Sequence, residues 1–338
     1  MTSNTPAPIL ITGAGGFIGQ ELVHALLKKD PHSHLLLTDT FAPPVPQEHA
    51  ARVTSQAADL TDPASLRVLI HPGQPLRCVY ALHGLMSGGS EANLNLGLAV
   101  NLDSHRNLLD HLRTFFPGVR VVFTSSTAVF GHLSELHGGK RAHDVVVSEA
   151  TQPLPASSYG AEKHIIETLV LDYTRRGLLD GMVVRLPTVI VRPGAPSAAA
   201  SSFASGIVRE TVKGEENVLP VRRDMRMWVC SPEVVIANLV HVLDVRSDRQ
   251  GNGAIGTGNV VNLPGTTCTV QDILDALTGA IGEDTVKRLV QEKNDAVIEK
   301  IVDSWPATFD TSWASKLGFH DDVTIKENIE NYVAKRRT

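Results

Sequence analysis

The stretch PILITGAGGFIGQELVHALLKKD, residues 8–30, decides the fold of this chain. Its apolar run at 9–12 predicts a buried strand, and the leucines further along recur at helical spacing. Between them lie three glycines. Gly13 permits a tight turn, Gly16 lets a pyrophosphate approach the backbone, and Gly19 lets the helix pack closely on the sheet. Because a helix N-terminus also presents unpaired N–H groups to phosphate, the stretch predicts a dinucleotide site.

An acidic residue at the end of the next strand fits that site. The strand predicted at 34–39 ends in Asp39, which lies 20 residues past Gly19. A carboxylate at this place accepts hydrogen bonds from an adenosine ribose and repels a 2′-phosphate, so the sequence favours NAD over NADP. Asp59, after the third strand, is a candidate for the adenine edge, with a turn or cap as the alternative.

Strands and helices alternate along the first 191 residues. Such an order requires right-handed crossovers and places helices on both faces of a parallel sheet. We therefore predict an α/β fold, with a Rossmann-type doubly wound parallel sheet over residues 1–191. The expected strands lie at or within 9–12, 34–39, 53–62, 77–84, 119–126 and 181–191, and the expected helices at 20–29, 94–116 and 158–177.

A change of composition after residue 191 predicts a smaller C-terminal region. Residues 192–338 are expected to be mainly substrate-binding, with 259–265 returning to the sheet. An amphipathic helix is expected at 269–282, opened by a capping box of Thr269 and Asp272. Residues 132–156 are expected to form a loop over the site, and the residues after Ser304 short helices and loops.

The composition excludes several classes of protein. The 338 residues carry 31 basic and 36 acidic side chains, a net charge of −5, so we expect no nucleic-acid partner. There is no run of about 18 apolar residues, so no membrane span is expected. The polar first residues do not form a secretory signal, which favours the cytoplasm. The widely spaced Cys78, Cys230 and Cys268 form neither a zinc pattern nor a disulfide framework, so we expect reduced thiols and no metal.

Tyr159 and Lys163, in SSYGAEKHII at 157–166, are four residues apart and share one face of the predicted helix. A hydride leaves an alcohol carbon only if the hydroxyl proton is also removed, which requires a general base. Lowering the pKa of a tyrosine from 10 to about 7 takes roughly 4 kcal/mol. Lys163 together with a cationic nicotinamide is the only local combination of charges large enough to stabilise the phenolate by this amount. Taken alone, such a pair could equally be a contact on the surface of a helix. Because this pair follows a dinucleotide-binding loop in the same chain, we predict that Tyr159 is the general base.

Ser126 completes the predicted catalytic group. It lies at the end of VRVVFTSS, the fifth predicted strand, 33 residues before Tyr159. From the carboxyl end of that strand its hydroxyl is expected to hydrogen-bond the reacting hydroxyl and hold it in line. Ser125 and Thr127 are the alternatives, and a serine at a strand end also commonly caps the next element.

These motifs resemble the extended short-chain dehydrogenase/reductase superfamily, the NAD-dependent epimerase/dehydratase group. The resemblance rests on TGAGGFIG, FTSSTAVFG, YGAEK and RLPTVIVRPG. A narrower resemblance, to the D-erythronate dehydrogenases, covers most of the chain between residues 8 and 320. It rests on GLMSGGSEANLNLGLAVNLDSHRNLLDHL, SYGAEKHIIETLVLDYTRRGLLDG, RLPTVIVRPGAPSAAASSFASGIVRE, RMWVCSPEVVIANLVH and SWPATFDTSWASKLGF. It implies oxidation of D-erythronate to 2-oxo-tetronate with NAD⁺, and a homodimer formed through the helices at 94–116 and 158–177.

Position by position, the resemblance implies roles for single residues. Ser126, Tyr159 and Lys163 match the catalytic trio, and Asn101 matches an asparagine that supports a proton relay, with a packing amide as the alternative. The sequence departs at ALHG, where family members more often carry His-Leu-Ala-Ala, so His83 is expected near the cofactor where alanine is usual. The positions at which the family contacts NAD are Gly13, Gly16, Phe17, Ile18, Gly19, Asp39, Asp59, Leu60, Leu82, Tyr159, Lys163, Pro187 and Val189.

A short polyhydroxy acid needs one cation for its carboxylate and several partners for its hydroxyls. Residues of these types lie after strand four and after strand six, on the expected substrate side of the sheet. The alternatives are a Ser/Ala-rich loop with helix caps, and an ion pair of Arg209 with Glu210 or Glu215. The candidates are Ser87, Ser126, Thr127, Tyr159, Arg192, Ser201, Ser202, Ser205 and Arg209.

Two other functions remain open at this point. A sugar-nucleotide epimerase of the same superfamily would retain its NAD, and a non-enzymatic scaffold or sensor would only bind it. Dehydratases of this fold usually carry an Asp-Glu pair after the Ser/Thr position, where this chain has Thr127 and Ala128. Scaffold proteins tend to lose the tyrosine or the lysine, and both are present. The sequence therefore favours an NAD-dependent dehydrogenase acting on CH–OH.

Overall fold

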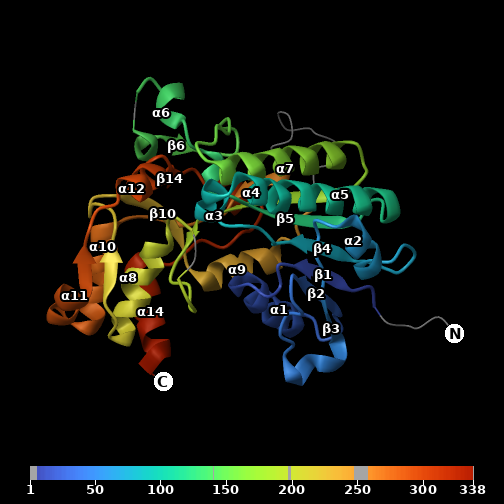
Figure 1. Cartoon of the computed structure of the whole chain (residues 1–338), viewed down its shortest axis with the longest axis horizontal. Coiled ribbons are helices and arrows are strands. Elements are labelled where there is room, and N and C mark those ends of the chain that lie inside the picture. The colour runs from blue at the N-terminus through green and yellow to red at the C-terminus, as the bar shows by residue number, and fades with distance from the viewer. Residues whose placement is uncertain (1–5, 140, 197–198, 247–257, 338) are drawn as a thin grey trace.

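The computed structural model describes residues 6–139, 141–196, 199–246 and 258–337. Figure 1 shows a sheet with helices above and below it, and beside it a smaller lobe of helices and short strands in which the chain ends.

Seven parallel strands form the central sheet, in the order β11-β7-β5-β4-β1-β2-β3. The strand order changes direction between β1 and β4, which is the topological switch point of a doubly wound sheet. The predicted Rossmann-type fold is confirmed. The strands are β1 (Ile9–Thr12), β2 (Leu35–Asp39), β3 (Val53–Ala57), β4 (Cys78–Ala81), β5 (Arg120–Ser126), β7 (Asp180–Leu186) and β11 (Val260–Asn262).

Helices cover both faces of the sheet (Figure 1). On one face α1 (Phe17–Lys29) packs against α9 (Pro232–His241), and their buried leucines share one core cluster with β1. On the other face α5 (Ser104–Phe115) packs between α2 (Pro63–Leu69) and α7 (Ser158–Arg175). Apolar strands enclosed in this way are typical of parallel sheets.

The helix predicted at 94–116 is not continuous. It consists of α4 (Leu94–Gly97), π-helical turns at Leu98–Asp103, and α5. The hydroxyl of Ser104, the first residue of α5, donates to the carbonyl of Val100 in the π-helical turns at 2.5 Å. π-helical turns are rare in proteins, and those that occur often lie at functional sites. Figure 1 places α4 and α5 alongside α7.

The sixth strand predicted at 181–191 is divided in two. β7 ends at Leu186, because Pro187 has no N–H with which to continue the ladder. β8 (Thr188–Val189) leaves the main sheet and pairs with β10 (Arg226–Cys230), which also pairs with β12 (Thr266–Thr269). This second sheet starts the smaller lobe directly beside the carboxyl end of β7.

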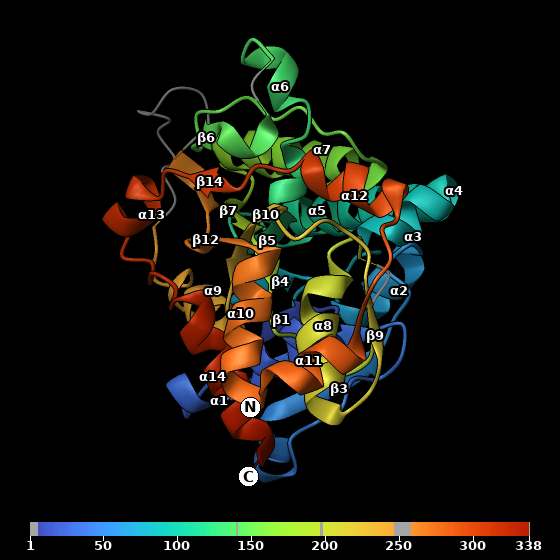
Figure 2. The ribbon, with the colours of Figure 1, turned by 90° about the vertical axis from the view of Figure 1, so that its left-hand side faces the viewer.

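Figure 2 looks onto the smaller lobe, where α8, α10, α11 and α14 group together. The capping box of Thr269 and Asp272 is confirmed at the start of α10. The prediction of only short helices after Ser304 is wrong for α14, a 13-residue helix that packs on α10. Its buried Ile329 and Val333 are four residues apart, in a segment where most of the other residues are polar or charged and hide the pattern. The helices are α8 (Ser202–Lys213), α10 (Val270–Ile281), α11 (Glu283–Leu289), α12 (Ala296–Asp303), α13 (Ser312–Lys316) and α14 (Ile325–Arg337).

Short elements complete the described chain. Within the predicted loop at 132–156, β6 pairs with β14 and so ties this loop to the smaller lobe. β9 and β13 form a further two-stranded pair. These elements are α3 (Ser87–Ala92), α6 (Leu133–Leu136), β6 (Val146–Val147), β9 (Asn217–Leu219), β13 (Val290–Glu292), β14 (Thr308–Phe309) and short 3-10 helices at Gln47–Arg52, Thr127–Val129 and Ala142–Asp144.

Among the described residues, none of the helices has the length and apolarity needed to cross a membrane. The domain boundary expected after residue 191 stays a prediction. β11 pairs with β7 and α9 packs on α1, so residues on both sides of that boundary build the layers of the main sheet.

Candidate active site

Two adjoining cavities open at the carboxyl ends of β1, β4 and β5. The glycine-loop cavity, about 540 Å³, is lined by residues from the ends of β1, β2 and β4. The tyrosine cavity, about 170 Å³, is lined by residues from β5, α7 and β8. The residues common to both are Ile18, Leu82, Met86 and Arg192. A crevice at the switch point is where open α/β sheets bind their ligands.

The glycine-loop cavity is shaped by its glycines. Gly13 has a φ of 67°, and a side chain there would lie 2.6 Å from the backbone nitrogen of His83. A side chain on Gly19 would lie 2.6 Å from the Gly13 carbonyl oxygen. Gly16 is the N-cap of α1, so the free N–H groups of the helix face the cavity. This cradle fits the pyrophosphate of a dinucleotide.

The structure brings together nine of the residues predicted to contact the cofactor. They line the glycine-loop cavity, and they are Gly13, Gly16, Phe17, Ile18, Gly19, Asp39, Asp59, Leu60 and Leu82. Four others, namely Tyr159, Lys163, Pro187 and Val189, line the tyrosine cavity. The two groups meet at the residues that both cavities share.

The two acidic residues of the glycine-loop cavity are held differently. Asp39, at the end of β2, accepts hydrogen bonds from the backbone N–H groups of Gly15 at 3.1 Å and Thr40 at 2.8 Å. Its carboxylate is thereby fixed beside the glycine loop. Asp59 accepts from the N–H and the hydroxyl of Thr61 at 2.9 and 2.7 Å, so it also fulfils the alternative role in a turn.

In the tyrosine cavity the predicted catalytic side chains lie together. Ser157 caps α7 by accepting from the Gly160 N–H at 3.1 Å, which places Tyr159 in the first turn. The Lys163 ammonium lies 5.7 Å from the centroid of the Tyr159 ring and donates to the Thr124 carbonyl at 3.0 Å. Ser126, at the end of β5, lines the same cavity as Tyr159, and its hydroxyl acts to lower the pKa of the tyrosine.

Burial dominates the charge state of the pair. It raises the pKa of Tyr159 to about 12, and the hydrogen bond from Ser126 and the positive charge of Arg192 act in the opposite direction. Burial also lowers the pKa of Lys163 to about 8, and the carboxylates of Glu167 and Glu162 oppose that change. The protein alone therefore does not make the phenol acidic, although the positive charge of Arg192 acts to lower its pKa.

Arg192 lies where the two cavities meet, and α8 fixes its backbone. Its N–H donates to the Ser205 hydroxyl at 3.1 Å, and its carbonyl accepts from Nη1 of Arg209 at 3.0 Å. Arg209, only 2% exposed, donates through Nε and Nη2 to Oε1 of Glu210 at 2.8 and 2.6 Å. Arg209 also lines the glycine-loop cavity. The pairing of Arg209 with Glu210 is one of the alternatives that the sequence left open. Ser205 and Arg209 hold the backbone of Arg192 through these hydrogen bonds.

Of the other residues predicted to contact the substrate, some line the tyrosine cavity and one does not. Ser87, Thr127 and Ser201 line the tyrosine cavity together with Ser126. Ser87 also accepts from the Ala200 N–H at 3.2 Å, which joins the loop after β4 to the segment before α8. Ser202 begins α8 and is not among the residues that line either cavity.

Asn101 lies in the π-helical turns and is fully buried. Its amide donates to Glu162 at 2.7 Å, Ser90 at 3.0 Å and the Leu85 carbonyl at 3.0 Å, and its oxygen accepts from the Leu85 N–H at 2.7 Å. It does not line either cavity. These bonds hold the loop after β4 against α7, which agrees with the alternative of a packing amide.

His83 lies under the glycine loop. Its Nδ1 is 2.7 Å from the Thr12 hydroxyl, its Nε2 is 2.9 Å from the Ser104 hydroxyl, and its ring stacks on that of His105 at 3.7 Å. Burial lowers the pKa of His83 to about 3, so the imidazole is neutral at pH 7. It links β1 to the start of α5 and lines the glycine-loop cavity.

Sequence reasoning missed Met86 and Trp305, which line the tyrosine cavity. Trp305 belongs to SWPATFDTSWASKLGF, but neither periodicity nor spacing connects it with Tyr159. The three cysteines are buried and free, and no group of residues suited to a metal ion is found in the described part of the chain.

Comparisons with known proteins agree with this geometry. The model of the NAD dependent epimerase/dehydratase family matches residues 9–256. D-erythronate dehydrogenase of Cupriavidus necator is 40% identical over 334 residues, 96% of this chain and 97% of that protein. D-erythronate dehydrogenase of Haemophilus influenzae is 35% identical over 326 residues, 96% of this chain and 98% of that protein.

Among solved structures, a nucleoside-diphosphate-sugar epimerase from Agrobacterium tumefaciens has a TM-score of 0.84 at 32% identity, over 98% of this chain and 94% of that one. L-threonine 3-dehydrogenase from Trypanosoma brucei has a TM-score of 0.81 at 22% identity, over 98% of this chain and 97% of that one, a likeness of fold. The chain belongs to the NAD dependent epimerase/dehydratase family.

Proposed function

We propose that this protein oxidises the 2-hydroxyl of a short polyhydroxy acid with NAD⁺, and that the substrate is D-erythronate and the product 2-oxo-tetronate. The observation that carries the proposal is the place of Arg192. It lines the tyrosine cavity together with Tyr159 and Ser126, at the border with the glycine-loop cavity. A carboxylate bound by this guanidinium would bring the adjacent hydroxyl carbon to the tyrosine.

The cofactor fits the glycine-loop cavity. The N-terminus of α1 and its glycines would hold the pyrophosphate, and Asp39 would accept from the adenosine ribose. Lys163, which lines the tyrosine cavity, would bind the nicotinamide ribose. When bound, NAD⁺ supplies the acceptor for the hydride that leaves carbon 2.

The chain's own residues orient the alcohol and remove its proton. Ser126 hydrogen-bonds the substrate hydroxyl and keeps it in line with Tyr159, which lines the same cavity. Tyr159 takes the hydroxyl proton. Because burial holds the phenol's pKa near 12, the phenolate depends on nearby positive charge, which Arg192, Lys163 and the oxidised nicotinamide ring provide together.

The epimerase alternative retains one supporting observation, namely the 32% identity to a structure titled a nucleoside-diphosphate-sugar epimerase. An epimerase would interconvert sugar nucleotides without net formation of NADH. A dehydrogenase releases NADH at every turnover, so the two functions differ in a directly measurable product.

The proposal is tested by mixing the purified protein with NAD⁺ and D-erythronate and following the absorbance of NADH. Steady accumulation of NADH supports the proposal. Interconversion of UDP-sugars without net NADH would replace it by the epimerase, and NAD⁺ binding without turnover of any acid or sugar would leave a scaffold or sensor.

We further propose that the protein is a cytoplasmic homodimer that pairs through α4, α5 and α7. The exposed apolar side chains Leu94 and Leu96 on α4 and Ile165 on α7 support this pairing. Sedimentation of the purified protein would give the mass of a dimer, and the mass of a monomer at micromolar concentration would contradict it.

A further inference from the structure

The tyrosine cavity has two different ends. At one end it adjoins the glycine-loop cavity, and Arg192 belongs to both. At the other end it adjoins a small third cavity, and the residues common to these two are Thr127, Thr188 and Trp305. No residue lines both the glycine-loop cavity and the third cavity. Trp305 therefore lies at the end remote from the cofactor, across the tyrosine cavity from Arg192.

Trp305 lines both the tyrosine cavity and the third cavity, together with Thr127 and Thr188. Beyond it lie Met227 and Trp228 of β10 and Val302 of α12. Trp305 is half-buried, and it packs on the core of the smaller lobe rather than projecting into solvent. A smaller side chain at this position would join the two cavities and lengthen the space available to a substrate.

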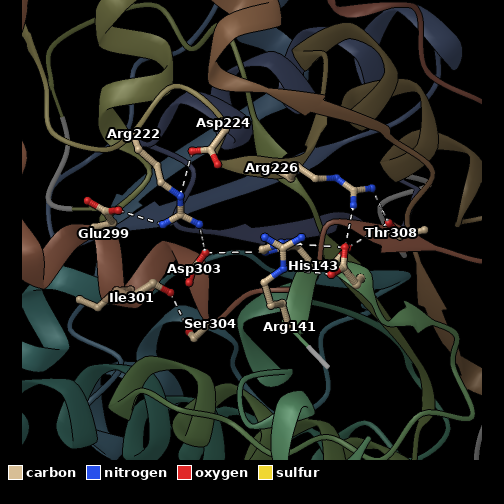
Figure 3. A network of polar contacts seen from close by, with 11 residues as sticks. Arg141, His143, Arg222, Asp224, Arg226, Glu299, Ile301, Asp303, Ser304 and Thr308 are labelled. Atoms are coloured by element: carbon tan, nitrogen blue, oxygen red, sulfur yellow. Dashed lines mark hydrogen bonds and ion pairs between the residues drawn. The ribbon is translucent and has the colours of Figure 1, made fainter. Parts of the chain in front are cut away.

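A network of ion pairs fixes the backbone that carries Trp305 (Figure 3). Arg222 binds Glu299 at 2.9 Å and Asp303 at 2.7 Å, both on α12. Asp303 also lies 3.7 Å from Nδ1 of His143, in the segment 132–156. The backbone N–H of Trp305 donates to the Val302 carbonyl at 3.1 Å, which ties the backbone of Trp305 to the end of α12.

A second arm of the network holds the chain after Trp305. Arg226 donates to Asp144 at 3.1 Å and to the Thr308 hydroxyl at 3.2 Å (Figure 3). The tryptophan is thus anchored two residues before it, at Asp303, and three residues after it, at Thr308. A residue whose backbone is held on both sides can serve as a rigid wall, since displacing it would disturb the ion pairs of α12 on one side and the hydrogen bond of Thr308 on the other.

We propose that Trp305 determines the length of the substrate, and that Arg222 positions it. The inference rests on the proposed function, because it takes the carboxylate to lie at Arg192. A four-carbon acid held there by its carboxylate, with carbon 2 at Tyr159, directs its last carbon toward Trp305. A fifth carbon meets the indole, so the site selects four-carbon acids over longer ones.

The test compares two acids in the full-length enzyme. D-ribonate extends D-erythronate by one CHOH group and keeps its configuration at carbons 2 and 3. The quantity measured is kcat/KM for D-ribonate divided by kcat/KM for D-erythronate, at saturating NAD⁺. In Trp305→Ala this ratio is expected to rise by about tenfold or more, the range by which pockets discriminate a single carbon. In Trp305→Phe, which keeps part of the wall, the rise is smaller.

Arg222→Ala tests the positioning role, with Arg223→Ala as the matched control. Arg223 is the next residue and pairs with Glu292 at 2.6 Å, away from α12. Arg222→Ala should shift the ratio in the same direction as Trp305→Ala, whereas Arg223→Ala should leave it unchanged. Circular dichroism and NAD⁺ affinity identify the folded variants, and Trp305→Phe supplies the comparison if the alanine variant does not fold.

The outcomes separate this inference from the proposed function. A wild-type enzyme that makes no NADH from D-erythronate overturns the proposed function, and the inference with it. A wild-type enzyme that oxidises D-erythronate, with an unchanged ratio in the folded Trp305 variants, overturns the role of Trp305 alone. Equal ratios in Arg222→Ala and Arg223→Ala overturn the positioning role.

Discussion

Replacing Arg192 by methionine tests whether one cation serves both the substrate and the base. The guanidinium lies at the border of the two cavities, and its charge lowers the pKa of Tyr159 against the effect of burial. Methionine keeps much of the length and the apolar contacts but removes the charge. A charge-assisted hydrogen bond contributes about 1.5–3 kcal/mol, so kcat/KM for D-erythronate should fall roughly 10- to 150-fold from this contact alone.

The loss of charge should also change the pH dependence. Tyr159 acts as a base only when it is deprotonated, and without Arg192 its phenolate is less stable. The limb of the kcat/KM profile that reports the base should therefore move to higher pH in Arg192→Met.

The assay is steady-state formation of NADH at saturating NAD⁺ between pH 6 and 10. Arg192→Lys is the control, because it keeps the charge but not the planar fork, and it should retain the pH limb while losing affinity. Wild-type kcat/KM and a wild-type pH limb in the methionine variant would refute the reasoning.

Three further predictions follow from buried or cavity-lining charges. Asp39→Ala should weaken NAD⁺ binding and reduce the preference over NADP⁺, and unchanged selectivity in titrations of both cofactors would count against the role of Asp39. Arg209→Met leaves Glu210 buried without its partner and should cost about 3–5 kcal/mol in the free energy of unfolding, measured by urea denaturation. Adding Glu210→Gln should restore most of that stability but not kcat/KM, because the Arg192 carbonyl still lacks its donor; full recovery of activity would show that Arg209 is only structural. Burial acts to raise the pKa of Glu167, but Arg185 outweighs it and lowers that pKa to about 2. The pair therefore stabilises the fold above pH 4.5, and its contribution is lost as the pH falls toward 2. The acid unfolding curve of Glu167→Gln should be flatter over this interval, and an unchanged slope would contradict the assignment.

The main sheet could be predicted because its signals are local. The apolar runs of β1, β2 and β5 are bounded by turn residues, and the glycine loop has a spacing that few other structures require. The split of the strand at 181–191 could not be predicted as easily. Pro187 ends β7, but the partner of β8 is β10, about forty residues further along the chain, and no local pattern indicates that pairing.

The catalytic residues of the site could be predicted from the sequence more easily than the residues that hold them in place. Tyr159, Lys163 and Ser126 carry a recognisable spacing, and the structure places them in one cavity. Arg209 has the residue type of a substrate ligand, but its distance from Glu210 and from the Arg192 carbonyl depends on how α8 packs. Trp305 reaches the cavity only through the packing of α12, which depends on long-range ion pairs.

The central claim is that Tyr159 removes the proton from the substrate hydroxyl. It is tested most directly by comparing the wild-type enzyme with Tyr159→Phe, while NAD⁺ affinity is measured separately by calorimetry. We predict that turnover of D-erythronate falls by about 10²–10⁴-fold, the usual contribution of a general base, while the Kd for NAD⁺ is unchanged. A phenylalanine variant that oxidises D-erythronate at a rate comparable to wild type would contradict the account.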